Sequence, residues 1–217
     1  EDLLPGEVLV TDRGSCFLHR EHYPLEHRHG ALPLSALLAH PARVAAQLAR
    51  DERLAGLDPT RWAFVDTETT GLAGGTGTYA FLVGIGLFEA GRFTVYQYFM
   101  RDYDEEPAQI QSLSRVLEPL RAVVSFNGKS FDLPLLETRF IITRQRPPLS
   151  GAPHLDLLPV SRRIWKHRLE SCALSSLEEQ VLGVRRAQDD VPGWLIPGLY
   201  GDYVRSGNDL RALIPAV

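Results

Sequence analysis

Residues 62–71 of the chain, WAFVDTETTG, join a short apolar run to two carboxylates. The run Trp62 to Val65 predicts a buried strand. Residues two apart in a strand face the same side, so Asp66 and Glu68 present like charges together where that strand ends. Burying such a pair is costly unless a cation binds it, and hard divalent cations such as Mg²⁺ or Mn²⁺ prefer oxygen ligands. An acidic turn that caps the next segment is the alternative interpretation.

A second segment, residues 126–134 (FNGKSFDLP), follows a later predicted strand and leads into a helix. Ligands of α/β sheets bind at the carboxyl ends of strands, which is where this segment is expected. Asp132 is therefore a candidate third carboxylate, and the amide of Asn127 is able to orient a ligand. The alternative is a plain strand–turn–helix connection with Asp132 as the helix N-cap.

From residue 61 onward the pattern is α/β. Short connections between the first three predicted strands favour antiparallel neighbours. Residues 174–182 carry a capping-box pattern at Ser175 and Glu178. The expected elements are strands at 62–65, 78–88 and 93–100, a helix over 107–120, a strand at 122–126, and helices over 131–142, 156–168 and 174–182. A loop over 187–198 and a partly helical end over 199–217 follow. The first five predicted elements of this domain are therefore three strands, a helix and a fourth strand.

The first sixty residues differ from the rest and predict an N-terminal appendage, residues 1–60, packed on a main domain of residues 61–217. One or two short strands are expected within residues 7–20. A helix is expected over residues 34–50, although Pro41 interrupts its pattern.

Composition narrows the function classes. The 217 residues carry a net charge of −4, which argues against a basic surface for tight, nonspecific nucleic-acid binding. Two cysteines argue against a disulfide framework and predict a reducing, cytoplasmic setting. No apolar run approaches the roughly 18 residues of a membrane span.

Together, the segments around Asp66 and Asp132 resemble the DEDD superfamily of 3′–5′ exonucleases. Asp66 and Glu68 look like its first motif, and Asn127 with Asp132 looks like its second. The chain is more similar still to the bacterial YprB-type ribonuclease-H-like family, over nearly its whole length. The matching stretches are residues 66–86, 127–134, 154–158, 162–166 and 177–186, with the pairs Pro192-Gly193 and Ile196-Pro197.

The resemblance implies a ribonuclease-H-like mixed sheet, with three antiparallel strands followed by parallel strands, flanked by helices. It also implies a 3′–5′ exonuclease that acts on single-stranded DNA or RNA ends with two Mg²⁺ or Mn²⁺ ions. Asp66 would bridge both ions, Glu68 would bind one and help to position the water, and Asp132 would complete the site. The expected substrate-binding residues are Thr67, Thr70, Gly71, Asn127, Lys129 and Phe131, with Asp156 and Trp194 as further candidates.

The chain departs from the family in one respect. A fourth acidic residue is expected in a late third motif, after a stretch like residues 209–217, and the sequence ends at Val217. Asp156, Asp202 and Asp209 are possible substitutes, although Asp156 is better interpreted as the N-cap of the next helix. The alternative functions are a catalytically silent nucleic-acid-binding module on the same fold and a metal-dependent endonuclease.

Overall fold

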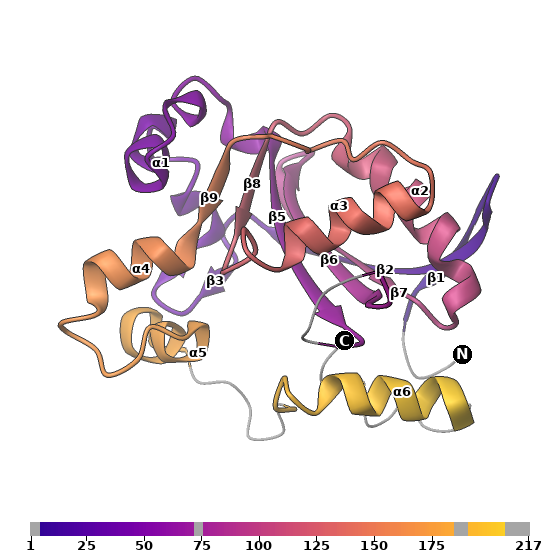
Figure 1. Cartoon of the computed structure of the whole chain (residues 1–217). Helices are drawn as coiled ribbons and strands as arrows, with labels where there is room; N and C mark the ends of the chain where they lie inside the picture. Colours follow the sequence, from indigo (N-terminus) through magenta and orange to yellow (C-terminus); the bar gives the residue numbers. More distant parts are fainter. Residues whose placement is uncertain (1–4, 72–75, 185–190, 207–217) are drawn as a thin grey trace.

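The computed structural model describes residues 5–71, 76–184 and 191–206, and it is built around one seven-stranded sheet (Figure 1). The strand order is β1-β2-β7-β6-β5-β8-β9. Neighbours from β1 to β5 are antiparallel, whereas β5, β8 and β9 are parallel. The strands are β1 (Glu7–Thr11), β2 (Gly14–Pro24), β5 (Trp62–Thr69), β6 (Ala80–Glu89), β7 (Arg92–Phe99), β8 (Ala122–Ser125) and β9 (His154–Asp156). The predicted mixed-sheet fold class is confirmed.

Helices cover both faces of this sheet. On one face, α2 (Glu106–Leu117) and α3 (Asp132–Ile142) bury their apolar residues against Ala63 and Val65 of β5. On the other face, α1 (Ala42–Ala49) and α4 (Leu157–Trp165) pack against Trp62, also of β5. The alternation of Trp62, Ala63 and Val65 between two cores follows from the two-residue period of a strand.

The last described helix, α6 (Ile196–Ser206), lies along the edge where β5 ends (Figure 1). Its Tyr200 is fully buried and stacks on Phe81 of β6, with ring centroids 3.9 Å apart. The Tyr200 hydroxyl donates to the carbonyl oxygen of Met100 at 3.0 Å. An aromatic core therefore fastens α6 to the sheet beside the end of β5.

The N-terminal residues are not all an appendage. Strand β2 pairs with β7 from Phe17↔Phe99 to Pro24↔Arg92, and β1 pairs with β2, so this hairpin extends the main sheet. Short-range patterns do not reveal such a pairing between segments far apart in the sequence. The predicted boundary between residues 60 and 61 stays a prediction.

The expected helix over residues 34–50 is split by Pro41. A 3₁₀ turn (Leu34–Ala36) precedes the proline, and α1 begins only at Ala42, with Pro41 as its N-cap. Proline has no amide hydrogen and its ring clashes with the preceding turn, so one continuous helix cannot form here.

Other boundaries also differ from the predictions. Strand β5 continues past Val65 to Thr69, because the backbone of Asp66 to Thr69 pairs with β6. The capping box was wrong, since the N-cap of α5 (Leu174–Leu177) is Ala173 and no side chain caps it. A π-helical turn (Glu178–Leu182) follows α5. Helix α6 starts inside the loop predicted over 187–198, and residues 185–190 and 207–217 lie outside the described residues.

The remaining elements are short. They are the strand pair β3 (Arg28–His29) and β4 (Leu32–Pro33), and three 3₁₀ turns at Glu52–Leu54, Pro59–Arg61 and Tyr103–Glu105. Within the part of the chain that the structure describes, no helix has the length and apolar character needed to cross a membrane.

Candidate functional site

The candidate site lies at the edge where the parallel strands β5 and β8 both end. Their register, Trp62↔Ala122 to Phe64↔Val124, brings the carboxyl ends of the two strands to the same edge of the sheet. Asp66 and Glu68 occupy alternate positions near the end of β5, opposite Gly84 and Leu82 of β6. This is the edge at which open α/β sheets place their ligands.

The third carboxylate, Asp132, reaches this edge from α3. The hydroxyl of Thr67 donates to Asp132 Oδ1 at 2.5 Å, which ties the first residue of α3 to β5. Asp132 is not the N-cap, because that position belongs to Phe131 and has no side-chain cap. The structure therefore places the side chain of Asp132 beside β5 and rejects the alternative interpretation of this residue as a cap.

The negative charges of Asp66 and Asp132 act on Glu68. Burial, followed by the charges of Asp66 and Asp132, raises the pKa of Glu68 to about 7. Burial also raises the pKa of Asp132, although the hydrogen bond from Thr67 offsets part of this effect. Oxygen ligands that repel one another in this way suit a hard divalent cation, which would remove the repulsion. The chemistry of these donors therefore fits the implied metal.

The carboxylates are neighbours without forming a closed cage. Among residues 5–71, 76–184 and 191–206, no three His, Cys, Asp or Glu side chains converge closely enough to hold a metal ion. The assignment of Asp66, Glu68 and Asp132 as metal ligands therefore stays a prediction.

A tight turn after β8 leads into α3 and Asp132. Asn127 adopts a left-handed conformation with φ of 71°, which is uncommon for a residue with a side chain. At Gly128, an added Cβ would lie 2.6 Å from Ser125 Oγ and 2.9 Å from Asp132 Oδ2, so only glycine fits. The amide of Gly128 donates to Ser125 Oγ at 3.1 Å. The turn therefore packs directly against one of the candidate ligands.

Asp156 has a larger role than the sequence predicted. Its Oδ1 accepts the amide of Leu158 at 3.1 Å, which confirms the predicted N-cap of α4. The same carboxylate also accepts the amides of Asn127 at 2.8 Å and of Lys129 at 3.1 Å. These partners lie 27 to 29 residues away, a separation that local patterns do not reveal.

Two further residues that the sequence analysis missed support the same turn. Ser125 Oγ lies 2.8 Å from His154 Nε2, which links the ends of β8 and β9. Burial lowers the pKa of His154. The sequence signals were position, since Ser125 precedes the turn, and the family-like stretch 154–158 that begins at His154.

The other predicted substrate-binding residues lie either in the connection after β5 or at exposed positions. The Thr70 hydroxyl is already engaged, because it accepts the amide of Tyr79 at 3.0 Å, and Gly71 borders the undescribed residues 72–75. Lys129 is exposed, and its charge acts on Asp51 and His154. Phe131 is 59% exposed beside Asp132, and Trp194 is 73% exposed before α6, so both rings are accessible to a ligand.

The structure describes two of the three possible substitutes for a fourth ligand, Asp156 and Asp202, and both already have hydrogen-bond partners. Asp156 is occupied by backbone amides, and Asp202 is exposed and pairs with Arg205 at 2.9 Å. Asp209 lies outside the described residues.

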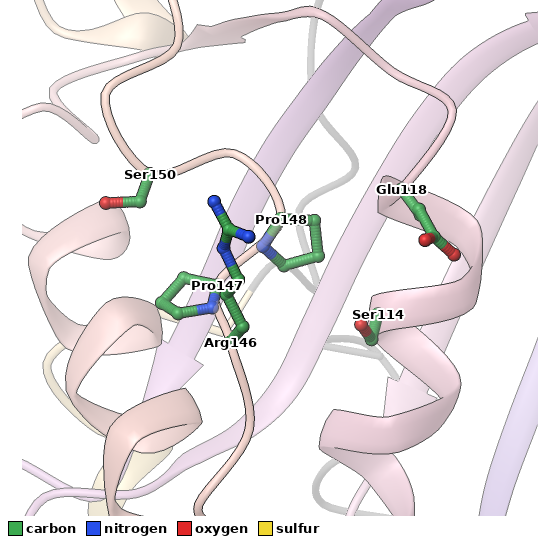
Figure 2. A pocket seen from close by; sticks show the side chains of 6 residues that line it. All are labelled: Ser114, Glu118, Arg146, Pro147, Pro148 and Ser150. Atoms are coloured by element: carbon green, nitrogen blue, oxygen red, sulfur yellow. The ribbon is translucent and has the colours of Figure 1, made fainter.

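A separate pocket of about 580 Å³ contains none of these carboxylates in its lining, and Figure 2 shows the residues that form it. Ser114 of α2 and its C-cap Glu118 line one side of it, and the segment after α3 lines the other with Arg146, Pro147, Pro148 and Ser150. This last segment belongs to the connection from α3 into β9, so the pocket is at the edge where the parallel strands begin. The pocket is therefore at the opposite end of the parallel strands from the candidate site.

Comparison with known proteins agrees with this architecture. A family model of the RNase H superfamily matches residues 63–213, and the chain belongs to that superfamily, whose members are generally nucleases. The chain is also 36% identical over 197 residues to the uncharacterized protein YprB of Bacillus subtilis (strain 168). That alignment covers 88% of this chain, which spans only 46% of the length of YprB.

Proposed function

We propose that this chain is a divalent-cation-dependent 3′–5′ exonuclease domain that hydrolyses phosphodiester bonds at single-stranded DNA or RNA ends. The observation that carries the proposal is the group of three carboxylates where β5 and β8 end, in which the charges of Asp66 and Asp132 both raise the pKa of Glu68. Membership of the RNase H superfamily supports nuclease chemistry in general. The 3′–5′ direction rests on the resemblance of the two motifs to DEDD exonucleases.

In this proposal, Asp66, Glu68 and Asp132 hold Mg²⁺ or Mn²⁺, which would supply a more acidic water and neutralise charge on the phosphate. Thr67 orients Asp132 through its hydrogen bond. Phe131, exposed beside Asp132, offers a ring on which a terminal base can stack. The side-chain amide of Asn127, at the same turn, would donate to or accept from the substrate.

The test is digestion of 5′-labelled single-stranded oligonucleotides, DNA and RNA in parallel, with Mg²⁺ or Mn²⁺. We expect a ladder that shortens from the 3′ end and disappears with EDTA. Asp66→Ala should lower the rate by about 100-fold or more, on the scale of losing one transition-state electrostatic contact. Asp104→Ala, an exposed carboxylate in a 3₁₀ turn, is the matched control and should cleave normally.

A second candidate function is a silent nucleic-acid-binding module. It is favoured by the observation that, in the described part of the chain, no three potential ligands form a closed metal cage. Oligonucleotide binding without any cleavage would support this module and contradict the exonuclease. Cleavage of a circular single strand, which has no ends, would instead establish an endonuclease.

A further inference from the structure

We propose that Asp156 is a positioning residue, which holds the turn of residues 127–129 and thereby sets the place of Asp132 in the carboxylate site. This inference rests on the proposed function for its meaning, but its geometry stands independently. Both carboxylate oxygens are used, with Oδ1 accepting from Asn127 and Leu158 and Oδ2 accepting from Lys129. The residue is 7% exposed.

Helix capping alone does not account for these contacts. An N-cap needs one acceptor for the amide of Leu158, and serine supplies it as well as aspartate does. The bonds to Asn127 and Lys129 instead connect the start of α4 to the turn after β8. A buried carboxylate is costly, and three backbone amide donors stabilise this one.

The backbone conformation of this turn requires stabilising contacts from its surroundings. Asn127 lies in the left-handed region, a conformation that costs free energy and persists where the surroundings impose it. From the other side, Ser125 accepts the amide of Gly128 and contacts His154. Two neighbouring strand ends, β8 and β9, thus fix the turn through side chains.

The turn of residues 127–129 in turn determines where α3 begins. The amide of Leu133 donates to the Gly128 carbonyl at 3.0 Å, and the missing Cβ of Gly128 leaves room for Asp132 Oδ2. A shift of the turn would therefore move Asp132 relative to Thr67 and Glu68. This chain of contacts runs from Asp156 to the turn, then to Asp132.

The charge of Asp156 and its geometry have different consequences. Asp156 is among the groups whose negative charge disfavours the ionised form of Asp132. If charge were its only influence, its removal would weaken the attraction for a cation but leave amide exchange at Leu133 unchanged. If positioning dominates, its removal weakens cation binding and also speeds amide exchange at Leu133, so the exchange pattern distinguishes the two effects.

The experiment compares the wild type with Asp156→Ser, which keeps a helix cap but cannot reach the turn. Amide hydrogen exchange and Mn²⁺ affinity are measured on the full chain. We expect the amides of Asn127, Lys129 and Leu133 to exchange faster, while that of Leu158 stays protected. Mn²⁺ affinity should fall by about 10- to 100-fold, the range for residues that orient metal ligands.

Asp58→Ser is the matched control, because Asp58 caps a 3₁₀ turn by accepting the amide of Thr60 and has no link to residues 127–129. It should change neither measurement. Asp156→Asn is the second variant should the serine variant not fold. It retains one acceptor oxygen, but its amide group faces the amide of Lys129, so the same exchange pattern is expected.

The outcomes separate the two proposals. Faster exchange at Asn127 and Lys129 with unchanged Leu133 would overturn the positioning role, as would an unchanged or increased Mn²⁺ affinity. A wild type that binds no Mn²⁺ would contradict the proposed function instead. In that case exchange at Leu133 still decides whether Asp156 controls the start of α3.

Discussion

Glu68 shows how a functional group lowers the stability of the protein that carries it. Its carboxyl has a pKa near 4.5 in the unfolded chain and about 7 in the folded chain, because of burial and the charges of Asp66 and Asp132. The folded state therefore binds the proton more tightly. Stability falls as the pH rises from about 4.5 to 7, and the loss is complete above that range.

Glu68→Gln should remove this loss in the metal-free protein. Because the side chain remains partly solvated, we discount the pKa shift to about 1 kcal/mol, which corresponds to a rise in Tm of about 2–4 °C at pH 8. The difference should shrink toward pH 4.5. Thermal unfolding in EDTA measures it, with the exposed Glu170→Gln as the control. Equal Tm values for the wild type and Glu68→Gln at pH 8 would contradict the repulsion described for the site.

At the scale of elements, one ion pair joins three segments of the molecule. Arg139 of α3 bonds to both carboxylate oxygens of Glu106 in α2, and it donates to the carbonyls of Thr76 and Thr78 before β6. Arg139 is 1% exposed and Glu106 is 6% exposed. The pair therefore fixes α2 and α3 to the connection that follows β5, close to the carboxylate site.

Arg139→Met should destabilise the fold by about 3–5 kcal/mol, because it leaves the charge of Glu106 buried without a partner. The double variant Arg139→Met/Glu106→Leu should regain about half of this loss, since an apolar pair replaces the ion pair. Urea unfolding measures both. Arg205→Met, which breaks the exposed pair with Asp202, should cost about 1 kcal/mol or less. A comparable loss at both positions would refute the special role of burial.

For the whole molecule, cation binding and folding are linked. A cation that binds only the folded state stabilises it by about 2.7 kcal/mol at 100 times its Kd. Saturating Mn²⁺ should therefore raise the Tm by about 5 °C or more. Thermal unfolding with and without Mn²⁺ is the measurement. The rise should vanish in Asp66→Asn and remain in Asp104→Asn. A similar rise in Asp66→Asn would locate the cation elsewhere.

Prediction from the sequence succeeded where the controlling contacts are local. Neighbouring residues indicate the apolar run before Asp66 and the strand–turn–helix order around Gly128, and both lie where they were expected. The N-cap at Asp156 is likewise a prediction that rests on a local contact. Prediction failed where partners are distant. The pairing of β2 with β7 and the bonds from Asp156 to Asn127 and Lys129 join segments that no periodic pattern connects.

The position of the β1–β2 hairpin has a consequence during synthesis. These strands are made before the rest of the sheet, yet β7, with which β2 pairs, begins only at Arg92. At about 5–20 residues per second, the ribosome completes β7 several seconds after Pro24. Until then the edge of β2 that will pair with β7 has no neighbour, and such an edge can pair with another chain. The nascent chain is therefore most exposed to chaperones and to aggregation before β7 emerges.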